Sequence, residues 1–422
     1  MTSNSLWYPY AQMRDLKPPF EVEAADGVYI HLQDGRRLVD AIASWWCVIH
    51  GYNHPELNAA VTRQCASMAH IMLGGLSHAP ARDAADLLVR ITPEGLGHVF
   101  FSDSGSVAVE VSLKMALQYW INKGKPGKKK FLALRKAYHG DTIGAMSVCD
   151  PDDGMHALFK ELIAPQIFLD PPASRPGDPN LAATLDQDLE RLEQILEQHA
   201  SELAAFIVEP LAQLAGGFRF HAPEFLTGAR ELCDRHGVLM IFDEVATGFG
   251  RTGTLFAADR TGITPDIMIL GKGLTGGYTG HAATLATTEI FESFYGDDTT
   301  NAFMHGPTYM ANPLACALML ASYEIFEREK YLAKIQRIES ILIEELTGFS
   351  ADVVRETRVL GAIGVVELHE PRQARGAQAF AAERGVWIRP LDQYVYTMPP
   401  YTISEDELRL VCAAIKDYAR SL

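Results

Sequence analysis

Cysteine is scarce and scattered in this chain. Its 422 residues contain six cysteines, and no two of them are spaced as Cys-x-x-Cys. A disulfide framework is unusual in so large a chain, so the cysteine pattern favours a reducing compartment, and we expect a cytoplasmic protein. The first ten residues have neither a basic segment nor an apolar core, so we expect no secretory signal peptide.

Long apolar runs and long basic runs are also missing. No hydrophobic stretch is long enough to span a bilayer, so we expect no membrane segment. The formal net charge of −16 argues against non-specific binding to nucleic acid or to an anionic membrane. The fourteen histidines include no His-x-x-x-His pair that encloses a glutamate, and no thiol cluster accompanies them, so we predict no catalytic metal.

The composition that remains is that of an ordinary globular enzyme, with 48% hydrophobic and 21% charged residues. A chain of 422 residues is too long for one small core, so we expect a large domain with a smaller one attached. Because the residue pattern changes near residues 55 and 310, we predict an N-terminal segment (1–55), a large domain (56–310) and a small C-terminal domain (311–422).

Helical and strand-like patterns alternate between residues 56 and 310, which predicts an α/β fold with a mostly parallel sheet covered by helices. The predicted strands are 98–101, 130–134, 204–208, 238–242, 267–270 and 282–286. The predicted helices are 56–71, 82–91, 107–121, 189–199 and 222–236, with a loop over 171–188. Elsewhere we predict a hairpin at Asp34-Gly35, helices over 311–347, strands within 358–367 and 386–398, and a helix opened by a capping box of Ser404 and Glu407.

Two of the apolar runs end next to an ionisable residue. Residues 238–242 precede Asp243, and residues 267–270 are followed by Gly271 and Lys272. Such runs are typical of buried parallel strands, whose carboxyl ends face the ligand crevice of an open sheet. An amine and a carboxylate in one crevice suit pyridoxal phosphate, because the amine forms a Schiff base with its aldehyde and the carboxylate keeps its pyridine nitrogen protonated. A structural Asp–Lys ion pair is the alternative.

Two further strand ends carry residues suited to a phosphorylated, flat cofactor. Residues 102–106 lie between a predicted strand and a predicted helix, where Gly105 lets the backbone approach a ligand and Ser106 can cap the helix. Free N–H groups at a helix start suit phosphate, although an ordinary N-cap is the alternative. Tyr138 also follows a strand, where its ring can stack on a cofactor or can instead be a partly buried turn residue.

Three residues are candidates for contact with a substrate. Arg389 ends a predicted strand just before a proline, where its guanidinium can clamp a carboxylate, and a surface arginine is the alternative. The adjacent Trp45 and Trp46 are expensive to expose, so they belong to the core unless they line a pocket.

Residues 248–253 match the dinucleotide fingerprint Gly-x-Gly-x-x-Gly. We interpret the match as accidental, because the preceding strand ends in Asp243 and Glu244, which would repel a pyrophosphate. Gly262 and Pro265 also make the following stretch a poor helix. A nucleotide-binding oxidoreductase is the alternative that this match leaves open.

Together these motifs resemble the class III (ω-amino acid) aminotransferases of fold type I, over essentially the whole chain. The shared pattern is an Asp-Glu strand end, a Gly-x-Gly-Arg-Thr-Gly turn and a Gly-Lys pair, here Asp243-Glu244, residues 248–253 and Gly271-Lys272. Further segments resemble the branch of this family that acts in biotin synthesis, namely residues 7–10, 44–46, 50–55, 103–106, 304–308, 360–364 and 386–390. The sequence departs from that branch at Tyr8, Leu214 and residues 278–281.

The resemblance implies a large domain with a mostly parallel sheet, and a small α+β domain built from the N-terminal segment and the C-terminal region. It implies that Lys272 carries the pyridoxal phosphate and shuttles the proton, and that Asp243 pairs with the pyridinium. Tyr138 is implied to stack near the ring and to contact substrate. Glu209 and Gln213 are expected near the cofactor.

The resemblance also implies a homodimer with shared active sites. Gly105 and Ser106 would hold the cofactor phosphate, and Pro307 and Thr308 would reach it from the neighbouring subunit. The substrate pocket would contain Tyr10, Trp45, Tyr138, Lys272, Gly306 and Arg389, the last of which would bind the carboxylate of the keto acid.

The reaction implied is the transamination of 8-amino-7-oxononanoate to 7,8-diaminononanoate, with S-adenosylmethionine as the amino donor. Lysine is an alternative donor, because no donor contact can be identified from sequence. A broader alternative is another ω-aminotransferase, which would use a diamine or a β-amino acid with pyruvate or 2-oxoglutarate.

Overall fold

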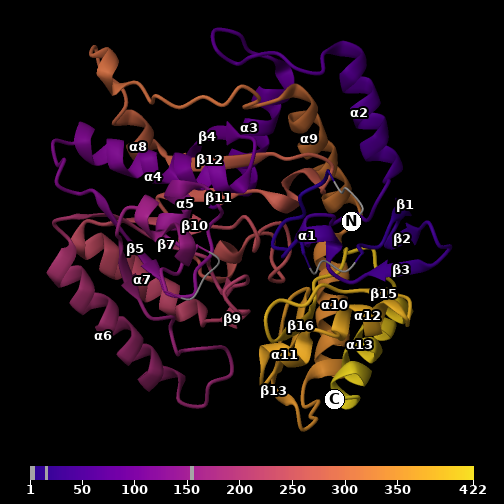
Figure 1. Cartoon of the computed structure of the whole chain (residues 1–422). Coiled ribbons are helices and arrows are strands. Elements are labelled where there is room, and N and C mark those ends of the chain that lie inside the picture. The colour runs from indigo at the N-terminus through magenta and orange to yellow at the C-terminus, as the bar shows by residue number, and fades with distance from the viewer. Residues whose placement is uncertain (1–4, 15–17, 153–155) are drawn as a thin grey trace.

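The computed structural model describes residues 5–14, 18–152 and 156–422 (Figure 1). Its largest element is a seven-stranded sheet with the order β4-β12-β11-β10-β7-β5-β6. The strands are β4 (Leu96–Ser102), β5 (Lys130–Leu134), β6 (Ile167–Leu169), β7 (Leu203–Val208), β10 (Leu239–Asp243), β11 (Ile267–Leu270) and β12 (Ala282–Thr287). Only β12 runs against its neighbours, so the predicted mostly parallel α/β sheet is confirmed.

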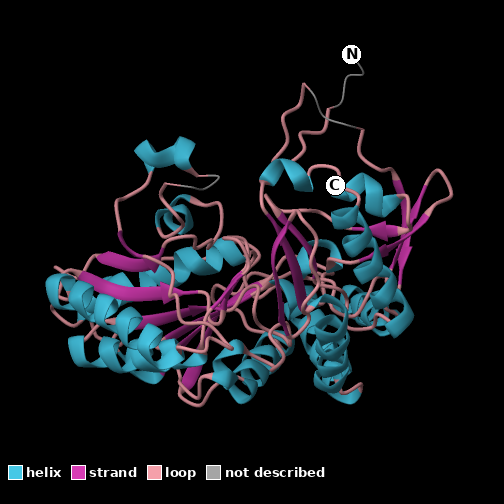
Figure 2. Cartoon of the chain, turned by 90° about the horizontal axis from the view of Figure 1, so that it is seen from below, coloured by secondary structure: helices cyan, strands magenta, loops and turns pink. Residues whose placement is uncertain are grey.

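Helices lie on both sides of this sheet (Figure 2). The alternation of buried side chains along each strand explains why. On β10, Leu239 and Ile241 belong to the core formed with α4 (Gly105–Asn122). Met240 and Phe242 belong to the opposite core, which includes side chains of α7 (Pro223–His236). Because both faces are buried, the strand is a continuous apolar run, as expected for a parallel sheet between helices.

The first strands and the C-terminal region share the smaller part of the molecule. Strands β1 (Val22–Asp26), β2 (Tyr29–Leu32), β3 (Arg37–Asp40) and β15 (Val386–Trp387) form one sheet, in which β3 and β15 are parallel. In Figure 1 the indigo strands therefore lie beside the yellow C-terminal helices. The predicted hairpin at Asp34-Gly35 joins β2 to β3. The domain boundaries at residues 55 and 310 stay a prediction.

The C-terminal region contains a second small sheet and five helices. The sheet consists of β13 (Val354–Leu360), β14 (Ile363–Leu368) and β16 (Tyr394–Thr397). The helices of this region are α9 (Pro313–Arg328), α10 (Tyr331–Leu346), α11 (Pro371–Ala374), α12 (Ala377–Ala382) and α13 (Glu405–Arg420). Ser404 and Glu407 form the predicted capping box at the start of α13.

The other helices are α2 (Pro55–Ser67), α3 (Ala79–Ile91), α5 (Ile143–Ser147), α6 (Leu181–His199) and α8 (Thr288–Glu292). The loop predicted up to residue 188 is wrong in its second half, because α6 begins at Leu181. Leu181, Leu185 and Leu189 have the i, i+4 spacing of one helix face, and the last two pack against the core. In the part of the chain that the structure describes, no helix is both long enough and apolar enough to cross a membrane.

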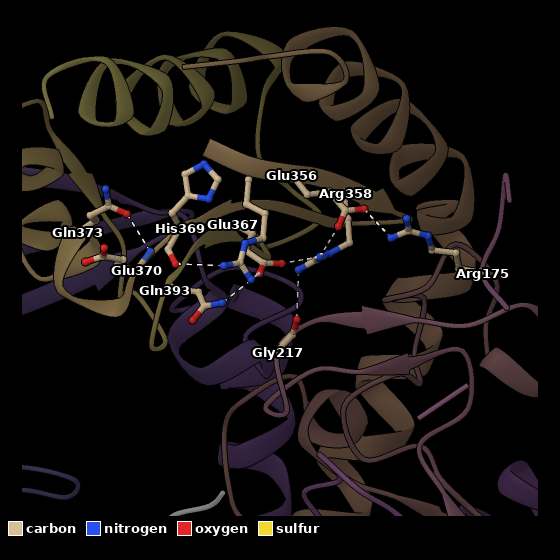
Figure 3. A network of polar contacts seen from close by, with 10 residues as sticks. Arg175, Gly217, Glu356, Arg358, Glu367, His369, Glu370, Gln373 and Gln393 are labelled. Carbon is tan, nitrogen blue, oxygen red and sulfur yellow. Dashed lines mark hydrogen bonds and ion pairs between the residues drawn. The ribbon is translucent and has the colours of Figure 1, made fainter. Parts of the chain in front are cut away.

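A network of charged side chains ties the C-terminal sheet to loops of the larger part (Figure 3). Arg358 on β13 donates to Glu367 on β14 at 2.7 Å and to the carbonyl oxygen of Gly217 at 3.2 Å. Arg175, in the loop before α6, pairs with Glu356 at 2.8 Å, and Glu356 also accepts from Arg358 at 3.1 Å. The network therefore holds the turn at Gly217 against the C-terminal sheet.

We expect Arg358→Met to lower the free energy of unfolding by about 1–3 kcal/mol, because the buried Glu367 carboxylate loses its shorter contact to a cation and keeps only Arg355 at 3.4 Å and the amide of Gln393 at 3.0 Å. Urea unfolding measures the loss. The matched control is Arg36→Met, which breaks an exposed pair with Asp34 and should cost less than about 1 kcal/mol. Equal losses in the two variants would contradict a structural role for the network.

Candidate functional site

A cavity of about 870 Å³ lies where the carboxyl ends of the central strands meet the C-terminal region, and a second one of about 230 Å³ adjoins it. The two share Trp46, Ser104, Gly105, Tyr138, Ala215 and Lys272. Eight of the predicted site residues line one or both of them, namely Tyr10, Trp45, Gly105, Ser106, Tyr138, Asp243, Lys272 and Arg389. The fold thus gathers residues from both ends of the chain and from four strand ends.

Asp243 is the last residue of β10, and its carboxylate is held from two sides. Oδ2 lies 2.7 Å from Nδ1 of His139, and Oδ1 accepts from the backbone N–H of Val245 at 3.0 Å. Nε2 of His139 is buried and has no partner among the described residues, so the proton of the ring belongs on Nδ1, where it is donated to Asp243. Asp243 is therefore paired with a histidine, and the alternative of an Asp243–Lys272 ion pair is not what the structure contains.

No sequence pattern pointed to His139 as this partner. The two residues are 104 positions apart, and only the neighbouring positions of β5, β7 and β10 in the sheet bring them together. The only hint in the sequence was that His139 follows Tyr138, a predicted site residue, at the end of a strand.

Lys272 follows β11 and has a left-handed backbone with φ of 43°. Its Nζ lies 5.2 Å from the centroid of the Trp46 ring. Burial of the amine lowers the pKa of Lys272, while the charges of Asp243 and Glu209 act in the opposite direction. A lowered pKa favours the neutral amine, which is the form that attacks an aldehyde.

The start of α4 differs in one detail from the prediction. The N-cap is Ser104, whose hydroxyl accepts from the N–H of Val107 at 3.3 Å, because Ser104 is the last extended residue before the helix. Ser106 is already inside the first turn, and its hydroxyl accepts from the N–H of Asp141 at 3.2 Å, so its predicted capping role is wrong. A Cβ at Gly105 would lie 2.9 Å from Val245 Cγ1, so this position needs glycine to pack closely.

These residues fit pyridoxal phosphate. The first N–H groups of a helix have no partner within the helix, and those of α4 lie at the smaller cavity, where they suit a phosphate. Asp243 and Lys272 line the same cavity and offer the carboxylate and the amine that the ring nitrogen and the aldehyde require. A ring held between these groups would also lie beside Tyr138 and Val245.

Asp141 lines neither cavity, but it contacts three side chains, two of which, Tyr10 and Tyr138, line the larger one. The hydroxyl of Tyr10 donates to its Oδ2 at 2.6 Å, and Tyr138 and His156 contact Oδ1 at 3.0 and 2.9 Å. Burial acts to raise the pKa of Asp141, but the hydrogen bonds from Tyr10 and His156 outweigh it and hold that pKa below its ordinary value. Tyr10 and Tyr138 were predicted site residues, whereas Asp141, which both of them contact, was not.

Trp45 and Arg389 form the outer part of the larger cavity. The Trp45 side chain is 43% exposed, and the Tyr10 ring meets it edge-on with 5.8 Å between the ring centroids. The guanidinium carbon of Arg389 lies 5.3 Å from the centroid of Trp45. The result is an apolar slot with a cation beside it.

Glu209 and Gln213 differ in their relation to the site. Glu209 lines the smaller cavity and accepts from the N–H groups of Tyr138 and Leu214 at 3.0 and 3.3 Å. Burial raises the pKa of Glu209 to about 7. Gln213 is buried and donates to the carbonyl of Arg135 at 3.0 Å, and it lines neither cavity.

Gly306, Pro307 and Thr308 line neither cavity of this chain. Gly306 and Thr308 are exposed. Within a single chain, the expected contribution of Gly306 to the substrate pocket is therefore not found, because the segment runs along the surface. Contacts of this segment with a neighbouring subunit stay a prediction.

The Gly-x-Gly-x-x-Gly segment forms buried turns and does not begin a helix that could bind a nucleotide. Residues 248–253 form a series of turns, and only a short 3-10 turn, Ala257–Arg260, follows them. Arg251 is fully buried and donates to the carbonyls of Pro399 and Ala362 at 2.9 and 3.3 Å. Glu244 accepts from the N–H groups of Ala257 and Ala258, so the carboxylate occupies the donors that a phosphate would use. This agrees with an accidental match.

The sheet, the strand-end amine and carboxylate, and the helix start beside them define a pyridoxal-phosphate-dependent enzyme of fold type I. The model of the family "Aminotransferase class-III" matches residues 10–418, and the chain belongs to this family. It is therefore an aminotransferase that uses pyridoxal 5′-phosphate and acts on small molecules, as the sequence predicted.

Several similar proteins carry one name. Adenosylmethionine-8-amino-7-oxononanoate aminotransferase of Mycobacterium leprae is 46% identical, covering 98% of this chain and 94% of the relative. The protein of that name from Corynebacterium glutamicum is 44% identical, covering 97% and 96%. The crystal structure of the protein of that name from Methanocaldococcus jannaschii has a TM-score of 0.93 at 32% identity, over 99% of this chain and 97% of that one. A PLP-bound amine transaminase from an uncultivated Pseudomonas species has a TM-score of 0.91 at 33% identity, over 99% of both chains.

Borohydride reduction of the holoenzyme should attach the cofactor covalently to Lys272. Lys272 is the only described lysine that lines either cavity. Peptide mapping by mass spectrometry identifies the labelled residue, and Lys272→Ala is the control that should carry no label. A label on another lysine in the unsubstituted protein would show that the amine is misassigned.

Proposed function

We propose that this protein transaminates 8-amino-7-oxononanoate to 7,8-diaminononanoate in biotin synthesis, with S-adenosylmethionine as the amino donor. The observation that carries the proposal is the similarity over nearly the whole chain, at 46% and 44% identity, to aminotransferases named for these two substrates. In the net reaction the donor exchanges its amino group for a carbonyl oxygen, and the 7-oxo group of the acceptor is replaced by an amino group.

The larger cavity suits this acceptor. The carbon chain of the acceptor is apolar and ends in one carboxylate. It matches an aromatic slot between Tyr10 and Trp45 that has the guanidinium of Arg389 beside it. The acceptor also carries an ammonium group. The carboxylate of Asp141, whose pKa its hydrogen bonds hold low despite the opposing effect of burial, supplies negative charge next to Tyr10 and Tyr138.

When bound, pyridoxal phosphate supplies an aldehyde that takes up an amino group and a ring that accepts the electrons released from the neighbouring carbon. In the proposed mechanism, the N–H groups of Gly105 and Ser106 would bind the phosphate. Asp243 holds a proton on the pyridine nitrogen, and the N–H groups of His139 and Val245 fix the orientation of its carboxylate.

Lys272 is the proposed acid and base. Its Nζ takes the proton from the amine-bearing carbon of the donor and later delivers a proton to C7 of the acceptor. The lowered pKa of Lys272, caused by burial, favours the neutral amine that takes up this proton. Tyr138 and Glu209 line the same cavity as Lys272, where they would help to exclude water from a bound cofactor.

The proposal includes a homodimer in the cytoplasm. Pro307 and Thr308 of one subunit would complete the phosphate site of the other, and Gly306 would border its substrate pocket. In support, the flanking Met304 and Tyr309 are 80% and 56% exposed, which suits burial in an interface. All six cysteines are free, as expected for a reducing compartment.

The test of this function uses the holoenzyme with separate donors. We expect 7,8-diaminononanoate, detected by mass spectrometry, when 8-amino-7-oxononanoate is supplied with S-adenosylmethionine. Arg389→Ala should lose about 2–5 kcal/mol of transition-state stabilisation in kcat/KM for the acceptor, or at least roughly 30-fold, because a buried carboxylate is left unpaired. Its single-turnover reaction with the donor, followed by cofactor absorbance, should change far less.

The control for Arg389 is Arg384→Ala, since Arg384 is an exposed arginine of the same region that stacks on Phe380 outside the cavities. Turnover with lysine but not S-adenosylmethionine would overturn the donor assignment. Turnover of a diamine with pyruvate or 2-oxoglutarate, and none of 8-amino-7-oxononanoate, would replace the proposed function by another ω-aminotransferase activity. An equal loss of both half-reactions in Arg389→Ala would overturn its assignment to the acceptor carboxylate.

Shared active sites can be tested by mixing subunits. Thr308→Val should weaken cofactor binding about 10–100-fold, the effect of one lost hydrogen bond to a charged group. In a heterodimer of this variant with Lys272→Ala, a contact made between subunits leaves one site with both Lys272 and Thr308 intact. That site should bind the cofactor as tightly as the unsubstituted protein, as measured by titration. Weak binding at the only Lys272-containing site would instead mean that Thr308 serves its own chain.

A further inference from the structure

The segment that carries the two tryptophans has a strained backbone. Although α1 (Ala43–Trp46) has helix-like hydrogen bonds, Ala43, Ser44 and Trp46 have φ values of 48°, 62° and 67°. Residues that have a Cβ rarely adopt this left-handed region. With ψ of −96°, the backbone conformation of Ser44 is close to that of the rare γ-turn with positive φ. Strained conformations persist only where the surrounding structure enforces them, and they concentrate at functional sites.

This turn gives the adjacent indoles two different environments. Trp45 is half-exposed in the larger cavity, beside Tyr10 and Arg389. Trp46 is buried against Lys272, and its indole N–H donates to the hydroxyl of Tyr396 at 3.2 Å. The turn therefore sets one wall of the substrate path and one wall of the lysine pocket at the same time.

A single buried carboxylate holds the turn. Oδ1 of Asp40 accepts from the N–H of Ile42 at 2.9 Å, and Oδ2 accepts from the N–H of Ser44 at 2.7 Å and from the hydroxyl of Tyr52 at 2.7 Å. Asp40 is fully buried and lines neither cavity. Burial raises the pKa of Asp40, and these three hydrogen bonds and the charge of Arg251 act against that shift.

The strand that bears Asp40 has other anchors. The N–H of Ala41 donates to the carbonyl of Trp387 at 3.0 Å, and its carbonyl accepts from the N–H of Met398 at 2.8 Å. The start of the segment is therefore fixed to the C-terminal region by its backbone. The Asp40 carboxylate additionally holds the conformation of residues 42–44, which lead directly into the two tryptophans.

We propose that Asp40, supported by Tyr52, is a positioning residue for the transamination, because it holds the strained turn that places Trp45 along the substrate path and Trp46 against Lys272. This proposal depends on the proposed function in one respect, namely that the larger cavity binds the substrate and the smaller one the cofactor. Asp40 touches neither cofactor nor substrate, so its effect must be transmitted through the two indoles.

The test compares Asp40→Asn with Asp188→Asn in the holoenzyme. An amide has one acceptor oxygen and directs its NH2 group at a donor, so Asp40→Asn loses at least one bond to the turn. Asp188 is a matched control, since it is buried, accepts from the N–H groups of Ala173 and Ser174 at 3.1 and 2.7 Å, and pairs with Arg191 outside both cavities.

For Asp40→Asn we expect a changed absorbance band of the bound cofactor, a changed near-ultraviolet circular dichroism of the indoles, and at least a tenfold rise in KM for the acceptor together with a lower kcat. Asp188→Asn should lower the melting temperature and leave these quantities unchanged. If Asp40→Asn loses only thermal stability and keeps its spectra and kinetic constants, Asp40 is a merely structural residue and the proposal is overturned.

Two further variants keep the proposal testable even if Asp40→Asn folds poorly. Tyr52→Phe removes one donor and keeps both backbone bonds, so it should shift the same spectra and raise KM by a smaller factor, about twofold to fivefold. Ser44→Gly relieves the left-handed strain, so adding it to Asp40→Asn should restore part of the lost activity. An inactive double variant, with Ser44→Gly alone active, would contradict the role of Asp40 in holding the turn.

The outcome is separable from that of the proposed function. If the substrate assignment is wrong, the unsubstituted protein fails to aminate 8-amino-7-oxononanoate, yet the spectral comparison of Asp40→Asn with Asp188→Asn still applies. If only the positioning role is wrong, the unsubstituted protein is active and Asp40→Asn has the spectra and KM of the unsubstituted protein.

Discussion

The site depends on keeping an acid and an amine at the ends of two neighbouring buried strands. Asp243 ends β10 and Lys272 follows β11, and both strands are enclosed by helices on each face. A buried carboxylate is destabilising unless hydrogen bonds satisfy it, and here His139 and the N–H of Val245 do so. Among the described residues no carboxylate pairs directly with Lys272, which keeps its amine available for chemistry.

The second constraint is that the cavity closes only when distant parts of the chain meet. Parallel pairing of β3 with β15 brings the first strands against the C-terminal region, and this pairing delivers both Trp45 and Arg389 to one slot. The Arg358 network adds a connection from the C-terminal sheet to the turn at Gly217, two residues after Ala215 in the cavity wall. The binding site and the association of the two parts of the molecule therefore rely on the same contacts.

Much of the fold followed from local patterns. The strands over 130–134 and 267–270 have the predicted bounds because apolar runs between turn residues leave little choice. The short strands β6, β8 (Ala212–Gln213) and β9 (Arg219–Phe220) were not predicted. Two or three residues are too few to reveal the alternation of apolar and polar residues that is typical of a strand. The start of α6 was placed too late because a proline-rich loop precedes it and hides the leucine spacing.

By itself, the sequence determined the chemistry: an amine and a carboxylate at strand ends, a helix start that contains Gly105, and aromatic and arginine residues for a pocket. These are properties of residue type and spacing, which local rules can detect. Only the tertiary structure decided the partners, because His139 reaches Asp243, and Tyr10 reaches Asp141, across more than a hundred residues. It also decided that Ser104 and not Ser106 caps α4, and that Asp40 holds a left-handed turn. Hydrogen bonds and backbone strain of this kind depend on where strands and loops lie in space. The periodicity of residues along the sequence does not predict them.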